Sequence, residues 1–387
     1  MGIPFIDLQA QRAQIADQVD AAIAKVLDHG AFIMGPEVRE LEAQLSAFTG
    51  ASHSIGCGNG TDALALPLMA WGIGPGDAVF CPSFTFTATA EIVPWEGASP
   101  VFVDIDPRTY NMDPASLEAA IEAVKSEGQL TPKVIIAVDL FGQPADYPAI
   151  RAIADRHNLK LIADSAQGFG CTIDGAHPIK WADAVTTSFF PAKPLGCYGD
   201  GGAVQVNSQE MWDLLDSLRV HGKATQADMD AAAYSGHEAK YLNPRIGMNS
   251  RLDSIQAAVL LQKLTIFAKE IRMREAVAQR YNTALEGHVL AVPFVKEGYQ
   301  STWAQYTIEV ENREAVQASL REDGVPSAVY YPVPMHMQGP YKDYPTAPGG
   351  LPVTEEKRSV VMSLPMHPYL DHETQDVVIE AVKKAIG

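Results

Sequence analysis

The most informative stretch of this chain is Thr186-Thr187-Ser188-Phe189-Phe190-Pro191-Ala192-Lys193-Pro194-Leu195-Gly196-Cys197-Tyr198-Gly199-Asp200-Gly201-Gly202. It starts in an apolar run at 185–189, passes Lys193 among aromatic and proline residues, and ends in a glycine-rich turn. A lysine in such surroundings is badly placed for a solvated charge and well placed to meet a ligand. Desolvation lowers the pKa of its amine, so Lys193 is a candidate Schiff-base nucleophile toward an aldehyde. From this segment alone, a loop lysine with a buried stem is an equal alternative.

Strand-like and helix-like patterns alternate around this stretch through the first two thirds of the chain. Such alternation predicts an α/β fold with a mostly parallel sheet and right-handed crossovers. In open sheets of this kind, ligands bind beyond the carboxyl ends of the strands. The predicted strands are 54–57, 78–81, 100–104, 134–138, 159–163, 185–189 and 203–206, and the predicted helices between them are 62–71, 116–124 and 147–156.

The last third of the chain has a different pattern. A long helical stretch at 252–285 is followed by residues that alternate in polarity at 305–310 and by helical patterns at 313–323 and from His372. These features predict a bridging helix and a smaller α+β unit.

Two domains are therefore expected, since single cores stop growing at roughly 250–300 residues. We expect a large α/β domain at 1–255, and a bridging helix with a small C-terminal domain at 256–387. A helix should begin at Gly35-Pro36-Glu37 and run to about Phe48. The polar stretch 223–240 has no clear period and is expected to be a mobile loop or an insertion.

Composition narrows the partners and the compartment. The chain has 387 residues, 47% of them hydrophobic, and a formal net charge of −18. Nucleic acid and anionic membranes bind clustered Lys and Arg, so neither is an expected partner. No apolar run approaches the roughly 18 residues of a membrane span and the start lacks the order of a signal peptide, which predicts a cytoplasmic protein. Four cysteines without a C-x-x-C pair predict reduced structural thiols and no metal site: Cys57, Cys81, Cys171 and Cys197.

Asp164 directly follows the predicted strand 159–163, at the edge where ligands bind. A carboxylate there can hold a proton on a pyridine nitrogen. Pyridoxal 5′-phosphate (PLP) needs such a carboxylate on its ring nitrogen and a lysine on its aldehyde. Asp164 and Lys193 are candidates for these two roles, and a helix cap or loop acid is the alternative for Asp164.

The segment Gly58-Asn59-Gly60-Thr61-Asp62-Ala63 follows the first predicted strand and opens a helix. Glycines there let backbone N–H groups approach a phosphate at the positive end of the helix dipole. The segment also fits the dinucleotide fingerprint G-x-G-x-x-A, which requires an acid at the end of the next strand. That strand is followed by Pro82-Ser83 instead, so a cup for a single phosphate is favoured, with Ser188 as a second donor.

Aromatic residues follow the second predicted strand in Pro82-Ser83-Phe84-Thr85-Phe86. Phe86 is a candidate to stack on a flat ring, which contributes roughly 0.5–1.5 kcal/mol beyond burial. A core phenylalanine is the alternative.

The cup, the aromatic residue, Asp164 and Lys193 follow successive strands in this order, and the chain thereby resembles the fold-type I PLP enzymes, which share the aspartate aminotransferase-like fold. It is most similar to the sugar aminotransferases of the DegT/DnrJ/EryC1/StrS family, nearly end to end. This resemblance implies a seven-stranded, mostly parallel sheet. The matching motifs are 35–37, 58–63, 164–167, 188–202, 245–253, 330–332 and 363–368.

The resemblance implies a role for each matching residue. Lys193 would form the internal aldimine and move the proton, Asp164 would pair with the pyridinium, and Gln167 would bond the ring hydroxyl side. The phosphate would be held by Gly60, Thr61 and Ser188, and Phe86 would stack on the ring.

Further implied roles concern the partner subunit and the substrate. Asn249 would reach the phosphate from the partner subunit, which implies a homodimer with shared active sites. Arg251, Tyr331 and His336 lie where relatives contact substrate. For His336, a solvated loop histidine is an equal alternative.

Within the family, the stretches 188–202 and 362–368 resemble enzymes that aminate C-3 of a UDP-linked 2-acetamido-3-keto sugar, or its uronic acid, for lipopolysaccharide and O-antigen synthesis. The expected reaction moves the amino group of L-glutamate to the sugar, with pyridoxamine 5′-phosphate as the intermediate form. Tyr330 stands where some uronic-acid members have histidine, which leaves the C-6 group open. A C-4 nucleotide-sugar aminotransferase, an NAD-dependent dehydrogenase and a non-catalytic PLP-binding regulatory protein remain alternatives.

Overall fold

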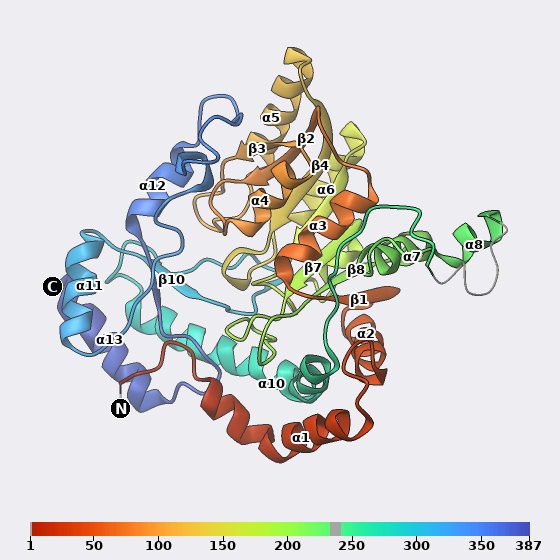
Figure 1. The fold of residues 1–387 in the computed structure, drawn as a ribbon. Helices are drawn as coiled ribbons and strands as arrows, with labels where there is room; N and C mark the ends of the chain where they lie inside the picture. Colours follow the sequence, from red (N-terminus) through yellow and green to blue (C-terminus); the bar gives the residue numbers. More distant parts are fainter. Residues whose placement is uncertain (1, 233–240) are drawn as a thin grey trace.

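A seven-stranded sheet forms the centre of the computed structural model, which describes residues 2–232 and 241–387. Its strand order is β1-β8-β7-β5-β4-β2-β3 (Figure 1). All seven are the strands that the sequence predicts. Their bounds are β1 His53–Cys57, β2 Asp77–Pro82, β3 Ser99–Val103, β4 Thr131–Val138, β5 Lys160–Asp164, β7 Ala184–Ser188 and β8 Gly202–Val206.

The sheet is parallel except for β8, which pairs antiparallel with both β1 and β7. The other six strands therefore end at one edge of the sheet. Apolar residues fill them: Leu161, Ile162 and Ala163 of β5 are completely buried, as expected for a parallel sheet covered on both faces. The α/β class and the mostly parallel sheet are confirmed.

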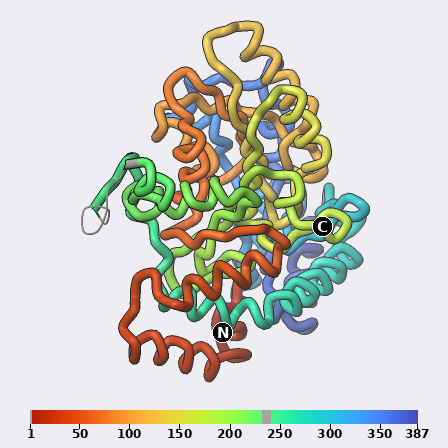
Figure 2. Tube along the Cα trace, turned by 90° about the vertical axis from the view of Figure 1, so that its right-hand side faces the viewer, coloured from red at the N-terminus to blue at the C-terminus, as the bar shows by residue number. Residues whose placement is uncertain are grey.

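Helices cover both faces of this sheet (Figures 1 and 2). Side-chain caps begin several of them: Asn59 accepts from the Asp62 N–H at 2.8 Å and Asp253 from the Gln256 N–H at 2.9 Å. From the start of the chain through the long helix α10, the described helices are α1 Leu8–His29, α2 Pro36–Thr49, α3 Gly60–Ala70, α4 Ala88–Trp95, α5 Pro114–Glu127, α6 Tyr147–His157, α7 Gln209–Leu218, α8 Gln226–Ala232 and α10 Ser254–Leu285.

The C-terminal part has its own hydrophobic core between α10 and two antiparallel strands. It contains β10 Tyr306–Glu309, α11 Arg313–Glu322, α12 Pro352–Val360, β11 Val361–Leu364 and α13 His372–Ile386, while β6 Thr172–Ile173 pairs with β9 Tyr299–Gln300. We propose the division at 255/256 on the strength of this separate core. Met335, Tyr341, Ala347 and Leu351 nevertheless pack into the core of the large sheet, so the second unit is anchored on the first.

One expectation needs correction. Part of the stretch 223–240, expected as a mobile loop or an insertion, is the helix α8 Gln226–Ala232, while residues 233–240 lie outside the described structure. The helix is held by polar contacts rather than by an apolar period: the Thr225 hydroxyl donates to Asp228 at 2.8 Å, and the more distant Arg245 donates to the same carboxylate at 2.6 Å. Helix α1, which the sequence patterns did not indicate, packs on α10 through Ile15 and Val19.

Among the described residues, no helix combines the length and the hydrophobicity that a membrane crossing requires. The cysteines Cys57, Cys81, Cys171 and Cys197 are buried, free thiols.

Candidate active site

The fold brings the predicted site residues of four strands to the carboxyl edge of the sheet. Asp164 is the last residue of β5 and Ser188 the last residue of the neighbouring β7. Gly60 and Thr61 open α3 directly after β1, and Phe86 follows β2. Because these strands are parallel, their ends form one rim, where ligands of open sheets bind.

Asp164 is a buried carboxylate with defined donors, and it is 4% exposed. Its Oδ2 accepts from the Thr89 hydroxyl at 2.9 Å, and its Oδ1 accepts from the Ala166 N–H at 3.2 Å. Burial raises the pKa of Asp164, while the two hydrogen bonds and the charge of Lys193 oppose that rise. The hydrogen bonds and the charge of Lys193 therefore offset part, but not all, of the cost that burial imposes on the ionised form.

Lys193 lies in the turn after β7, where its N–H donates to the Phe190 carbonyl at 2.8 Å. Burial lowers the pKa of its amine, and the carboxylate of Asp164 opposes this shift. The two side chains are therefore close enough to interact through their charges. A lowered pKa increases the share of neutral amine, which is the form that attacks an aldehyde.

The start of α3 and the end of β7 form a narrow cup. A Cβ atom at Gly60 would lie 2.6 Å from the Ser188 Cβ, so only glycine permits this approach. The first N–H groups of an α-helix have no partner within the helix and favour an anion. The N–H groups of Gly60 and Thr61 and the Ser188 hydroxyl thus lie together at one place and are candidate donors to a phosphate.

Gln167 has a fixed orientation beside Asp164. Its Oε1 accepts from the Phe141 N–H at 2.8 Å, so its Nε2 points the other way and donates to the Tyr331 hydroxyl at 2.9 Å. Phe141 has a positive φ of 60° in the loop after β4. An amide N–H is thereby available on the ring side of the site.

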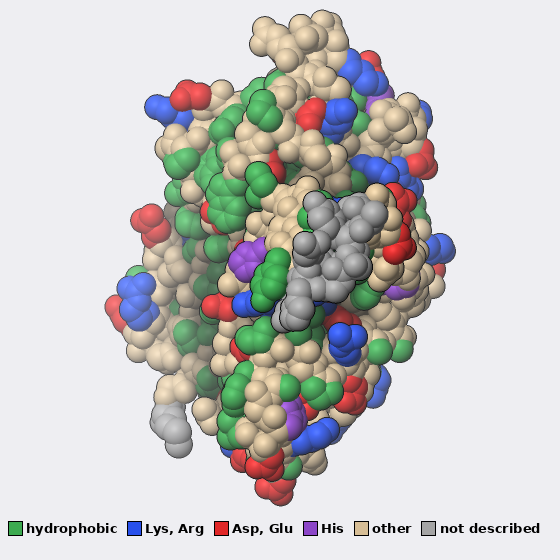
Figure 3. Space-filling model, turned by 45° about the vertical axis from the view of Figure 1, so that its right-hand side comes forward, with side chains coloured by type: hydrophobic (Ala, Val, Ile, Leu, Met, Phe, Trp, Pro, Cys, Tyr) green, Lys and Arg blue, Asp and Glu red, His purple; other side chains and the backbone are tan. Residues whose placement is uncertain are grey.

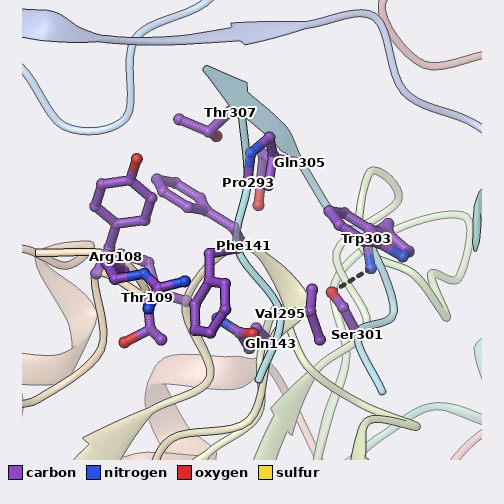
Figure 4. A pocket seen from close by; sticks show the side chains of 13 residues that line it. Arg108, Thr109, Phe141, Gln143, Pro293, Val295, Ser301, Trp303, Gln305 and Thr307 are labelled. Atoms are coloured by element: carbon purple, nitrogen blue, oxygen red, sulfur yellow. Dashed lines mark hydrogen bonds between the residues drawn. The ribbon is translucent and has the colours of Figure 1, made fainter. Parts of the chain in front are cut away.

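Phe141 also lines a second pocket, together with residues between 293 and 307 (Figure 4). Arg108, Gln143, Trp303 and Gln305 are among its lining residues. Neither Lys193 nor Asp164 lines it, so this pocket is separate from the candidate active site.

Phe86 is 53% exposed, and its ring centroid lies 6.2 Å from that of Tyr331 in a tilted arrangement. A partly exposed ring at the rim remains free to cover a flat ligand. His336 is held rather than freely solvated: its Nδ1 lies 2.7 Å from the Ser83 hydroxyl, and its N–H donates to the same oxygen at 3.0 Å. Because Ser83 directly follows β2, this places His336 near the rim.

The segment that contains Asn249 and Arg251 is hydrogen-bonded to the start of the phosphate cup. The Ser250 hydroxyl accepts from the Gly58 N–H at 2.9 Å, so this segment lies beside the start of the cup. Asn249 is exposed and Arg251 is half-buried. Within the described ranges, the Arg251 side chain has no hydrogen bond and no ion pair, so it is available for an anionic group.

Sequence reasoning missed Thr89 and Phe141, which hold Asp164 and Gln167 in place. Thr89 belongs to the same stretch after β2 as Phe86, so its position after a strand was a usable signal. Phe141 follows β4 at Val138-Asp139-Leu140, and its contribution through a backbone N–H left no signal in the residue type.

The chain matches the family model of the DegT/DnrJ/EryC1/StrS aminotransferases over residues 13–383. It is 47% identical to the UDP-2-acetamido-2-deoxy-3-oxo-D-glucuronate aminotransferase of Pseudomonas aeruginosa over 98% of this chain and 99% of that protein. It is 51% identical to a DegT/DnrJ/EryC1/StrS aminotransferase from Brucella abortus, with a TM-score of 0.94 and full coverage of both chains. NtdA from Bacillus subtilis, solved with bound cofactor PMP, is 31% identical, with a TM-score of 0.86 over 100% of this chain and 85% of that one.

This protein belongs to the DegT/DnrJ/EryC1/StrS aminotransferase family. It is a PLP-dependent aminotransferase with the fold of that family. The site fits the cofactor: a buried carboxylate, a partly desolvated lysine and a glycine-lined phosphate cup lie at one rim.

Proposed function

We propose that this protein transfers the amino group of L-glutamate to C-3 of a UDP-linked 2-acetamido-3-keto sugar, or of its uronic acid, in the synthesis of surface polysaccharide or lipopolysaccharide. The observation that carries the proposal is that the buried Asp164 and the partly buried Lys193 both lie at the carboxyl edge of the sheet, where the charge of each shifts the pKa of the other. PLP needs both groups from the protein.

Lys193 and Asp164 are the proposed catalytic residues. When bound, PLP supplies an electron sink for negative charge on the carbon that bears the amino group. The Lys193 Nζ, with its pKa lowered by burial, would take the proton from the Cα of glutamate and later deliver a proton to the sugar carbon C-3. The Asp164 carboxylate would hold the proton on the ring nitrogen.

The remaining proposed contacts hold the cofactor. Gly60, Thr61 and Ser188 would bind the phosphate, and Phe86 would cover the ring face. Gln167 would donate from Nε2 to the ring hydroxyl, since its Oε1 is already engaged by Phe141.

The proposed substrate contacts are Arg251, Tyr331 and His336. The half-buried guanidinium of Arg251 suits an anionic group such as a sugar carboxylate. The P. aeruginosa relative acts on a 3-oxo-glucuronate, which favours C-3 over C-4 and a uronic acid over a hydroxymethyl group.

We further propose a cytoplasmic homodimer with shared active sites, in which Asn249 reaches the phosphate of the partner subunit. Hydrophobic side chains gather on the face drawn in Figure 3. Phe86 and Phe190 next to the site are 53% and 52% exposed, and Ile246 is 89% exposed. Exposed apolar side chains of this size near a site are a common feature of interfaces.

The test is incubation of the PLP-bound protein with L-glutamate and a panel of UDP- and dTDP-keto sugars. NMR of the product distinguishes amination at C-3 from amination at C-4. Lys193→Ala should abolish product formation, whereas Lys180→Ala, which removes an exposed lysine, should leave it unchanged. Product formed by Lys193→Ala at the normal rate would overturn the assignment.

Two further measurements separate the alternative functions. Borohydride reduction followed by peptide mapping should find the PLP label on Lys193. A protein that takes the label there but forms no product from any sugar would be the non-catalytic regulatory protein. NAD reduction by a sugar, without a PLP label, would indicate the dehydrogenase.

A further inference from the structure

Two buried threonines form a one-way hydrogen-bond chain to Asp164. The Thr89 hydroxyl donates to the Asp164 Oδ2 at 2.9 Å, and the Thr85 and Thr89 hydroxyl oxygens lie 2.9 Å apart. A hydroxyl has a single proton. Because Thr89 gives its proton to the carboxylate, Thr85 must be the donor to Thr89.

This chain crosses the sheet. Thr85 lies in the loop after β2 and Thr89 in the first turn of α4, whereas Asp164 ends β5. Strand β4 lies between β2 and β5, so Thr89 reaches across a strand to the carboxylate. The three residues are 2%, 1% and 4% exposed, so water cannot easily replace either hydroxyl.

The carboxylate of Asp164 is fixed from both sides. The carboxylate Oδ1 accepts from the Ala166 N–H at 3.2 Å, on the opposite side from Thr89. The backbone carbonyl of Asp164 accepts from the Asp139 N–H at 3.0 Å, which holds the backbone of this residue. Thr89 is the side-chain donor of this set. Removing it frees the rotation of the carboxylate and takes away a donor that favours the ionised form.

We propose that Thr89, backed by Thr85, is a positioning residue that keeps the Asp164 carboxylate ionised and directed at the ring nitrogen of PLP. This inference rests on the proposed role of Asp164. Thr89 contacts neither substrate nor cofactor in this proposal and acts only through Asp164.

Several other charged or titratable groups interact with the Asp164 carboxylate. Lys193 after β7 lowers the pKa of Asp164, and the hydrogen bond from Thr89 lowers it as well, against the rise from burial. Tyr331 from the C-terminal part and Tyr147 of α6 also interact with the Asp164 charge, and Tyr147 donates to Asp139 at 2.6 Å. Without the Thr89 hydroxyl, fewer interactions oppose the rise in the Asp164 pKa that burial causes. Asp164 therefore takes up a proton at a higher pH.

The experiment compares Thr89→Val, Thr89→Ser and Thr85→Val in the PLP-bound protein. Valine keeps the shape of threonine and removes the hydroxyl, whereas serine keeps the hydroxyl. The probe is PLP labelled with 15N at the ring nitrogen, whose NMR shift reports protonation as pH is varied. The second readout is the split between kcat and KM for L-glutamate.

For Thr89→Val we expect loss of ring-nitrogen protonation at a lower pH than in the wild type, with kcat reduced about tenfold or more and KM within about twofold. A hydrogen bond to a charged group has this scale. Thr89→Ser should restore both readouts, and Thr85→Val should show a smaller change of the same sign.

Wild-type protonation in Thr89→Val would overturn the proposal. Should Thr89→Val fail to fold, an unchanged titration in Thr85→Val, or a titration of Thr89→Ser that differs from wild type, would overturn it instead. Asp164→Asn is the control for the underlying assignment. If Asp164→Asn leaves ring protonation unchanged, the proposed role of Asp164 fails, whereas an effect of Asp164→Asn without one of Thr89→Val refutes only the role of threonine.

Discussion

The Nε2 of Gln167 donates to the hydroxyl of Tyr331 at 2.9 Å, and this bond joins the two parts of the molecule at the candidate active site. Gln167 follows β5 of the central sheet, while Tyr331 comes from the loop before α12. The amide is oriented by Phe141, so the bond has a defined direction. The C-terminal part thereby contributes the Tyr331 side chain to the rim, although it has a separate hydrophobic core of its own.

Tyr331→Phe should weaken catalysis without loss of the cofactor. The substitution keeps the ring and removes the hydroxyl, which contributes about 0.5–1.5 kcal/mol. We expect kcat/KM for the keto sugar to fall roughly two- to tenfold, with an unchanged dissociation constant for PLP. Tyr344→Phe is the matched control, since Tyr344 packs on the core of the large sheet and its hydroxyl has no hydrogen bond among the described residues. An equal effect of both substitutions would show that the Gln167 bond is unimportant.

Arg219→Met should destabilise the fold strongly. The buried Arg219 donates from Nη1 to Glu42 at 2.5 Å and to the Gly56 carbonyl at 2.6 Å, and Glu42 also accepts from the Gly56 N–H at 2.8 Å. Removing the cation leaves Glu42 buried and unpaired, which costs about 3–5 kcal/mol. Urea unfolding measures this loss.

The control for this change is Arg12→Met, because Arg12 pairs with Asp20 at 2.9 Å on the surface. Because this ion pair is exposed to solvent, its removal should change the unfolding midpoint little. Since Gly56 is two residues before the cup, Arg219→Met should also raise the dissociation constant for PLP. Comparable stability of the two variants would contradict the importance of the buried pair.

The sequence was sufficient for the strands and for the residues at their ends. Buried parallel strands are short apolar runs, such as 159–163, and the side chain after each run reaches the rim whatever the details of packing. Hence Asp164, Ser188 and Gly60 could be placed at one edge from order alone.

Other features depend on tertiary contacts that no local pattern records. Helix α1 contains many alanines among polar residues, and it is held in place because Ile15 and Val19 are buried against α10. The Thr89 hydroxyl meets Asp164 only because β2 and β5 lie two places apart in the sheet, with β4 between them. The helix α8 is stabilised by the distant Arg245.

His367 should make the protein less stable at acid pH. It is 2% exposed, and within the described residues neither ring nitrogen has a hydrogen-bond partner. Burial and the charge of Arg274 lower its pKa from 6.5 to about 4. The unfolded chain therefore binds the proton more readily, so this stability is present above pH 6.5 and is lost as pH falls toward 4.

The size of this loss is about 3 kcal/mol, since one unit of pKa corresponds to about 1.4 kcal/mol. His367→Phe should flatten the dependence of unfolding free energy on pH between 6.5 and 4, as measured by urea titration. His372→Asn is the control, because His372 is exposed at the start of α13 and should leave the slope unchanged. A slope that persists in His367→Phe would contradict the assignment to this residue.

Gly60→Ala should weaken cofactor binding more than it weakens folding. Gly60 has no positive φ and lies in the first turn of α3, so alanine suits its backbone. The added methyl, however, would lie 2.6 Å from the Ser188 Cβ and 3.1 Å from its hydroxyl oxygen, which forces the two walls of the cup apart. We expect the dissociation constant for PLP to rise about tenfold or more, as small displacements in a preorganised site have large effects. Gly74→Ala is the matched control, because its nearest contact would be 3.8 Å away, at the Glu96 carbonyl. Fluorescence titration of the apoprotein with PLP compares the two variants, and equal affinities would show that the phosphate is bound elsewhere.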